Sequence, residues 1–355
     1  MGDWKRTLRA VGVNLALPAA SIGTALLLGG SIIALIGLNP FLAYYHMIVG
    51  AVGSVPAIGE TLVKAIPVAF TGLSFAFAFR CGLINIGAEG QLFMGGFGAA
   101  LVGIYLKGLP ALVHLPLALA GGFCIGGLWG MLCGWLKTRF GASEIITTVM
   151  TNYIAIHWVS YVVCGPMIEP PGDMPQTALV QVSAQLPRIL PGTRVHLGLV
   201  LAIAAVCFFS FYLWRTTRGY ETRVVGQNPH AAAYAGMNAV TNVLLAMFLA
   251  GGMAGLAGAG EVLGIQHRLH QGFSPGYGFD GIAVALLGRN TPVGVILAAL
   301  LFGALRSGGN LMQMLSRVPL AVISIIQALV IIFVIAEGIF RLRRKAPAGT
   351  GGAAR

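Results

Sequence analysis

Glu89 is the residue whose chemistry most needs an explanation. It stands in GLINIGAEGQLFMGG, residues 82–96, together with Asn85 and Gln91, between long apolar runs. An acid inside a membrane costs about 2.5–3.5 kcal/mol on insertion scales, so it usually faces a cavity or a partner. The cluster therefore predicts either the lining of a solute pathway or a buried polar network that fixes helix register. A position near the membrane interface, close to Arg80, would lower the cost.

Two other polar residues pose the same choice. Asp280 lies in GFDG, residues 278–281, which resembles GAEG, residues 87–90, because each puts an acid between small residues beside a short span. Transporters often contain two related halves with interrupted helices in corresponding places, so this match of four residues could be a trace of an internal repeat. Asn152 could face a pore, but we expect it to bond a neighbouring helix.

Catalytic and metal-binding motifs are missing from the sequence. It contains no H-E-x-x-H, no G-x-S-x-G and no phosphate-binding loop of the form G-x-x-x-x-G-K-[ST]. His267 and His270 are closely spaced and could share a helix face, but no cysteine or clear third ligand stands beside them. We therefore expect no catalytic site, no metal and no cofactor in this chain.

The composition indicates where these residues must work. Of 355 residues, 57 % are hydrophobic and only 9 % are charged, whereas soluble domains carry about 25 % charged residues. Apolar runs of about 20 residues, enough to cross the hydrocarbon core as a helix, recur along the chain. The sequence thus predicts an all-α polytopic membrane protein of about ten helices, some short or broken. The expected spans are 13–37, 59–79, 88–106, 111–136, 144–164, 196–214, 239–263, 278–288, 292–312 and 319–340.

Charge predicts how the spans are oriented. If the N-terminus is cytoplasmic and the spans alternate, most lysines and arginines fall on the cytoplasmic side, as the positive-inside rule requires. Membrane topology therefore explains the net charge of +12 better than nucleic-acid binding does. We expect a cytoplasmic tail 1–12, one transmembrane domain 13–340 and a cytoplasmic basic tail 341–355.

Two loops are long enough to have a role. The outer loop 165–195 is rich in proline and predicts an irregular cap. In the inner loop 215–238, Asn228 can cap a helix, Pro229 suits its first position and Gly236 can end it. The predicted two-turn helix could fit a groove on an ATPase or could be an ordinary amphipathic connector.

Four segments resemble one known family. FRCGLINIGAEGQLFMGG, ASEIITTVMTNYIA, VVGQNPHAAAYAGM and GFDGIAVALLGRNTPVG occur in the order found in permease subunits of bacterial ABC importers of the branched-chain amino acid and simple-sugar class. The chain resembles most the nucleoside-import branch, which works with basic membrane lipoprotein-type binding proteins. The resemblance covers about Glu60 to Glu337.

The resemblance implies a fold like that of type II ABC importers and a set of partners. These are a cytoplasmic ATPase that binds ATP, a second homologous permease in a heterodimer, and an extracytoplasmic binding protein. The segment Gly226–Gly236 would be the coupling helix, and Asn85, Glu89 and Gln91 would lie in a core motif near the pathway. The coupling residues would be Gly226, Asn228, Pro229, Ala231, Ala232 and Gly236.

The resulting hypothesis is an inner-membrane permease subunit that imports nucleosides, purine nucleosides first, by alternating access. One alternative is a stand-alone carrier or channel for a small polar solute, driven by an ion gradient through Glu89 and Asp280. Another alternative is an ABC importer of simple sugars.

Overall fold

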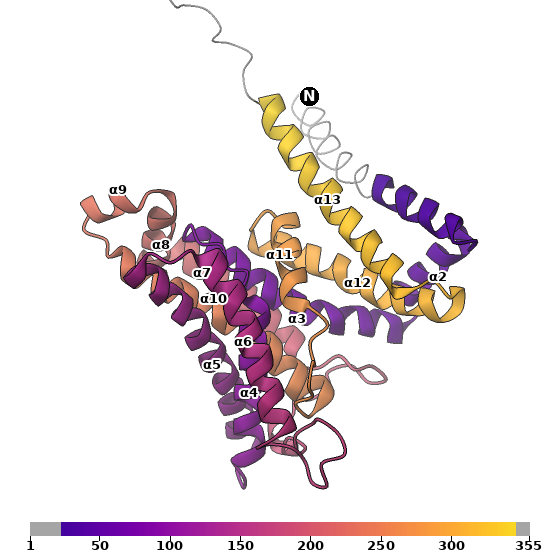
Figure 1. The fold of residues 1–355 in the computed structure, drawn as a ribbon, viewed down its shortest axis with the longest axis horizontal. Helices are drawn as coiled ribbons and strands as arrows, with labels where there is room; N and C mark the ends of the chain where they lie inside the picture. The colour runs from indigo at the N-terminus through magenta and orange to yellow at the C-terminus, as the bar shows by residue number, and fades with distance from the viewer. Residues whose placement is uncertain (1–22, 346–355) are drawn as a thin grey trace, which may run out of the picture. The chain divides into compact units, whose positions relative to one another are not determined.

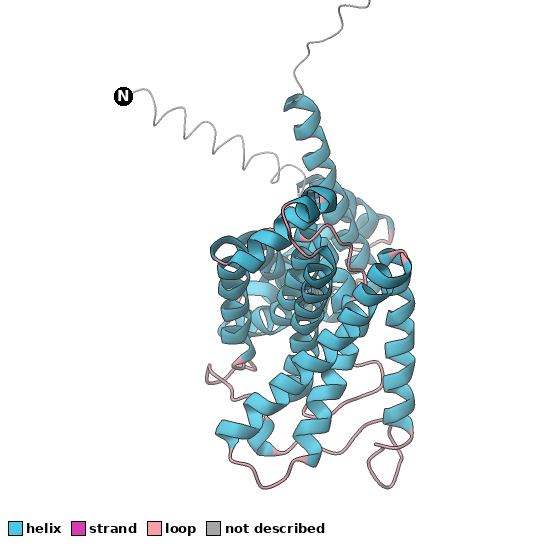
Figure 2. Cartoon of the chain, turned by 90° about the vertical axis from the view of Figure 1, so that its left-hand side faces the viewer, coloured by secondary structure: helices cyan, strands magenta, loops and turns pink. Residues whose placement is uncertain are grey.

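The computed structural model describes residues 23–345, which form helices joined by loops (Figure 2). The predicted tail 1–12, the start of the first span at 13–22 and residues 346–355 of the basic tail lie outside the described residues. Contacts divide the chain into two units. One is Ala51–Ser307, and the other joins the described residues up to Gly50 to those from Gly308 onward. The larger unit contains all the residues singled out above.

The helices follow one another along the chain as Figure 1 labels them. A first helix covers Gly23–Leu35. It is followed by α2 (Pro40–Val52), α3 (Val55–Arg80), α4 (Ala88–Tyr105), α5 (Ala111–Phe140), α6 (Glu144–Cys164), the 3-10 turn η1 (Val182–Ala184), α7 (Gly198–Arg215), α8 (Thr217–Gln227), α9 (Pro229–Tyr234), α10 (Ala239–Glu261), the π-helical turn η2 (Val262–Gln266), α11 (Tyr277–Leu287), α12 (Pro292–Ser316) and α13 (Leu320–Lys345).

The predicted fold class is confirmed, and most predicted spans match a helix closely. Among the described residues, five helices are long and apolar enough to cross a membrane: α3, α5, α7, α10 extended through η2, and α12. The segment 144–164 was predicted to the residue. Two of the described helices were not predicted. The first is α2, which lies outside the predicted spans. The second is α8, which precedes α9 in a loop where only one short helix was predicted.

Glycine faces bring the central helices of the larger unit into backbone contact. Within it, α10 packs against α5, α4 and α3 (Figure 1). A Cβ built on Gly251 would lie 2.4 Å from the carbonyl oxygen of Gly126, and one on Gly255 would lie 2.4 Å from that of Gly122. No other residue fits at this separation. The four-residue glycine spacing thus produces the small-residue packing that membrane helices use.

The predicted short eighth span is present as α11, which has 11 residues and is about 16 Å long at 1.5 Å per residue. It therefore covers about half of a hydrocarbon core. The helix before it ends in η2, and residues 267–276 connect the two without regular structure. Because α11 packs against α3, this short helix lies against protein, as broken helices in membranes require.

The long loop 165–195 has little regular structure apart from the short turn η1, and it is bonded to the chain that follows α10. The backbone N–H groups of Thr177 and Val180 donate to the carbonyls of Leu269 and His267, at 3.0 and 2.9 Å. Gln176 forms an isolated bridge with His270. The backbones of the two closely spaced histidines are thus bonded to this loop, and Nδ1 of His267 is 3.1 Å from the carbonyl oxygen of Leu263.

Candidate functional site

Glu89 joins two helix N-termini. Glu89 lies in the first turn of α4 and is only 3 % exposed. Its Oε2 accepts a hydrogen bond of 2.6 Å from the backbone N–H of Gly278, in the first turn of α11. A Cβ on Gly278 would lie 2.2 Å from the backbone nitrogen of Glu89, so glycine is required for this approach. The carboxylate is thus close to the positive ends of two helix dipoles, which stabilise it.

Asn85 and Gln91 form a closed pair beside Glu89. The amide of Asn85 donates to Oε1 of Gln91 at 2.9 Å, and the amide of Gln91 donates to Oδ1 of Asn85 at 3.0 Å. Asn85 also donates to Ser74 of α3 at 3.2 Å. Both amides are fully buried. Reciprocal bonding satisfies polar groups that would otherwise be costly in a membrane core, so in this conformation the pair holds the loop before α4.

Asn152 of α6 holds the same loop from the other side. Its Nδ2 donates to the carbonyl of Ile86 at 2.9 Å, and its Oδ1 accepts from the N–H of Gly90 at 2.8 Å. The expectation that Asn152 bonds a neighbouring helix is confirmed. The second bond satisfies one of the free N–H groups at the start of α4. Residues 82–90 are therefore fixed by α3, α6 and α11 together.

Asp280 lies two residues beyond Gly278 on α11 but does not bond Glu89. Its Oδ2 is 2.6 Å from a terminal nitrogen of Arg306 on α12. The guanidinium of Arg306 also lies over the ring of Tyr277, 4.9 Å from its centroid, and donates to the carbonyl of Pro275 at 3.3 Å. Arg306 falls within the predicted span 292–312. A lone arginine at that depth requires a partner, and this is the signal that could have paired it with Asp280.

The second predicted site, around α9, folds as the sequence predicted. Oδ1 of Asn228 accepts hydrogen bonds of 3.0 Å from the N–H groups of His230 and Ala231. Gly236 has a φ of +76°, and its N–H and that of Met237 bond back into the last turn, as in a Schellman ending. Within α9 only Ala232 is buried. The rest of the helix is exposed.

The helix that the sequence missed, α8, connects α9 to the buried loop. A Cβ on Gly226 would lie 2.3 Å from the carbonyl oxygen of Arg80, and one on Gly82 would lie 2.9 Å from that of Gly226. Two glycine backbones therefore touch where α8 meets the end of α3. Gly82 also has a φ of +75°, which glycine adopts without strain.

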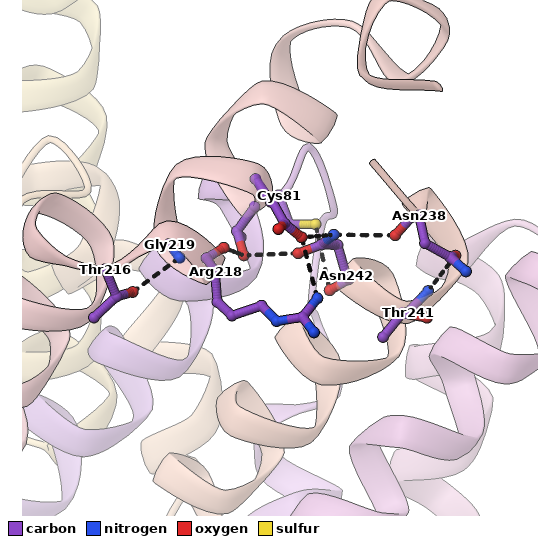
Figure 3. Close-up of polar contacts among 9 residues, drawn as sticks. Cys81, Thr216, Arg218, Gly219, Asn238, Thr241 and Asn242 are labelled. Carbon is purple, nitrogen blue, oxygen red and sulfur yellow. Dashed lines mark hydrogen bonds and ion pairs between the residues drawn. The ribbon is translucent and has the colours of Figure 1, made fainter. Parts of the chain in front are cut away.

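Asn242 of α10 makes a second connection to α8 (Figure 3). It is 1 % exposed, and its Nδ2 donates to Oε2 of Glu221 at 3.0 Å. Its backbone carbonyl lies 3.8 Å from the Cys81 thiol at the end of α3. Glu221 also pairs with Arg218 at 3.2 Å. The bond from Asn242, assisted by the charge of Arg218, lowers the pKa of Glu221, so this carboxylate remains ionised at neutral pH.

Residues 57–335 match the protein family described as branched-chain amino acid transport system / permease component. The chain belongs to this family. The permease component of an ABC transport system forms the membrane part and is not the catalytic subunit, since a separate subunit hydrolyses ATP. No solved structure was found to match this permease.

Several known proteins resemble this permease over most of its length. The guanosine ABC transporter permease protein NupP of Bacillus subtilis is 41 % identical over 90 % of this chain and 93 % of its own. The glucose ABC transporter permease protein TsgB13 of Haloferax volcanii is 37 % identical over 96 % of this chain and 92 % of its own. The nucleoside ABC transporter permease protein NupB of Lactococcus lactis is 34 % identical over 90 % of each chain.

Proposed function

We propose that this permease forms part of an ATP-driven importer of nucleosides, with guanosine-like purine nucleosides as the first candidates. The observation that carries the proposal is the 41 % identity to a guanosine permease across nearly the whole of both chains. The nucleoside permease of Lactococcus lactis supports it independently. Glucose is the second candidate cargo, because the glucose permease of Haloferax volcanii is 37 % identical over an even larger share of this chain.

A second permease completes the pathway in this proposal. The guanosine permease NupQ of Bacillus subtilis is only 26 % identical to this chain, against 41 % for NupP of the same organism. The chain is thus much more similar to one of two permeases whose names give the same cargo. We infer a heterodimer with a NupQ-like partner, an extracytoplasmic binding protein that delivers the solute, and an orientation in the inner membrane with both termini cytoplasmic.

In the proposed mechanism, α9 is the coupling helix that docks on the ATPase through its exposed surface. Six residues serve this role: Gly226, Asn228, Pro229, Ala231, Ala232 and Gly236. The cap of Asn228 and the ending at Gly236 keep so short a helix formed, although it is too short to be stable alone. Gly226 transmits its movement, because it touches Gly82 and therefore the loop that precedes α4.

The solute pathway in this proposal runs beside the N-termini of α4 and α11. Its inner wall is formed by Asn85, Glu89, Gln91 and Asp280. These residues are positioned to respond when the loop at Gly82 moves. The bond from Gly278 to Glu89 would carry that movement into α11. A nucleoside is neutral and amphipathic, so polar and aromatic groups suffice to bind it.

Transport by the reconstituted complex tests the proposal. The permease, its partner permease, the ATPase and the binding protein are assembled in vesicles, and uptake of radiolabelled guanosine and glucose is measured with and without ATP. We expect ATP-dependent guanosine uptake that glucose does not compete with. Glucose uptake without guanosine uptake would show that the transported solute is glucose and not a nucleoside. Uptake by the permease alone, driven by an ion gradient, would instead support the stand-alone carrier.

A further inference from the structure

A basic and aromatic cavity lies next to the coupling helix and has no role in the mechanism above. It has a volume of about 660 Å³ and is formed by the end of α7, by α8 and by residues 235–238. Three arginines line it: Arg215, Arg218 and Arg223. Trp214 and Tyr220 complete the wall. Arginine guanidinium groups beside aromatic rings are typical of sites that bind phosphate or carboxylate groups.

The positive charge of this cavity is only partly neutralised within the described part of the chain. Glu221, the acidic residue in the cavity wall, already forms an ion pair with Arg218 and accepts a hydrogen bond from Asn242. No ion pair to Arg215 or Arg223 is found among the residues whose side chains the structure describes, which are 23–319 and 321–333. Arg223 lies over the Trp214 ring at 4.2 Å, and its buried Nε has no hydrogen-bond partner. The cavity therefore has donors and charge available for an anionic ligand.

The cavity continues the outer face of α7, which has the properties of a lipid-facing surface. Ile203 is 50 % exposed, Phe211 is 61 % exposed and Trp214 is 52 % exposed. Only a third of the most apolar stretch of α7 is buried in the protein. Tryptophan and tyrosine concentrate where a membrane meets water, and Tyr220 at the start of α8 is also half exposed. An apolar strip thus leads directly into a cationic cavity.

We propose that this cavity binds the headgroup phosphate of an anionic phospholipid whose acyl chains lie along the exposed face of α7. The proposal rests on the inferred orientation, in which this end of α7 is cytoplasmic. The bound lipid would touch Gly236 and Asn238, which line the cavity and connect α9 to α10. It would therefore fix the coupling helix relative to the membrane surface.

Lipid retention by the assembled transporter tests this proposal without requiring transport. The complex is purified in detergent, titrated with phosphatidylglycerol or phosphatidylcholine, and its bound lipids are counted by native mass spectrometry. We compare the double variant Arg215→Gln/Arg223→Gln with Arg139→Gln/Arg188→Gln, which removes the same charge from exposed sites elsewhere. Each arginine near an anionic surface contributes about fivefold in affinity. We therefore expect phosphatidylglycerol to bind the cavity variant about 25-fold more weakly than the control variant.

Three outcomes would overturn the proposal. Equal phosphatidylglycerol binding by both variants would show that the cavity is not the lipid-binding site. Thermal stabilisation by inorganic phosphate but not by the lipid would identify a free-phosphate site. Unchanged lipid binding with loss of the ATPase from the variant would indicate that the cavity takes an acidic segment of that subunit. If the double variant does not fold, Arg215→Gln alone, at an exposed position, should still weaken lipid binding about fivefold.

Discussion

The carboxylate of Glu89 and the backbone N–H of Gly278 are hydrogen-bonded at 2.6 Å, although 189 residues separate them in the sequence. Each lies in the first turn of a helix. The bond satisfies an N–H of α11 that has no partner within its own helix. The cost of burying the acid is thus offset by two helix N-termini. Glu89 is therefore a joint between α4 and α11, whatever further role it has toward a solute.

Substitutions of Glu89 distinguish its structural role, the hydrogen bond to Gly278, from a requirement for its negative charge. Glu89→Gln keeps an oxygen that can accept from Gly278, so we expect normal assembly and most of the wild-type uptake. Glu89→Ala leaves the N–H unpaired, which costs about 1–3 kcal/mol, and should lower the thermal midpoint of the purified complex. Normal assembly of Glu89→Gln with complete loss of uptake would show instead that the charge itself acts on the solute.

The contact between Gly82 and Gly226 predicts a second effect. Alanine at Gly226 would put a Cβ 2.3 Å from the carbonyl oxygen of Arg80, and such overpacking costs about 1–3 kcal/mol. We expect Gly226→Ala to weaken the stimulation of ATP hydrolysis by the loaded binding protein. Gly260→Ala is the matched control, because a Cβ there meets nothing within 4 Å. Equal stimulation in both variants would contradict transmission through this contact.

Gly236 tests the ending of the coupling helix. Its φ of +76° is unfavourable for a β-branched residue by about 1–3 kcal/mol, while asparagine tolerates it better. Gly236→Val should uncouple ATP hydrolysis from uptake without removing the permease from the membrane. Gly236→Asn should remain coupled. Both variants are compared by the ratio of solute imported to ATP hydrolysed, and a normal ratio for the valine variant would argue against the coupling role.

The local structure of α9 and of α6 could be predicted from the sequence, because the signals are local. Asn228, Pro229 and Gly236 specify the start and end of α9 within a few residues, and the structure has both. The apolar length of a segment likewise predicted α6 completely. The missed helix α8 has little apolar content, and its stability comes from contacts such as that of Glu221 with Asn242.

Partners far apart in the chain could not be predicted in the same way. The cluster around Asn85 gave two interpretations, a solute lining or a buried network, because the sequence does not show which helix faces it. Its closed bonds with Gln91 and the contact of Glu89 with α11 depend on how the helices are packed. The pairing of Asp280 with Arg306 required the same information.

The ion pair between Asp280 and Arg306 should show strong coupling in a double-mutant cycle. Both side chains are about one fifth exposed, so removing one charge should cost about 2 kcal/mol, less than for a fully buried pair. We expect Asp280→Ala to lower the thermal midpoint and Asp280→Ala/Arg306→Met to recover part of the loss. Recovery should be incomplete, because Arg306 also contacts Tyr277. Additive losses in the double variant would show that the pair contributes nothing.

His196 predicts how stability depends on pH on the side of the long loop. It is 1 % exposed, and its Nδ1 accepts from the N–H of Gly198 at the start of α7. Burial, with a smaller effect of His267, lowers the pKa of His196 from 6.5 to about 4. The unfolded chain therefore binds a proton that the folded chain excludes, so stability is complete above about pH 6.5 and falls as the pH drops toward 4.

A pKa shift of this kind lowers the free energy of unfolding by about 3 kcal/mol at low pH. Protonation is unfavourable in the folded state because the ring would lose its acceptor nitrogen and would face the positive end of the α7 dipole. We expect the thermal midpoint of the purified complex to fall between pH 6.5 and 4. His196→Asn keeps an acceptor for Gly198 but cannot be protonated in this range, so its midpoint should fall less steeply. An identical pH profile for the two proteins would assign the acid sensitivity to another group.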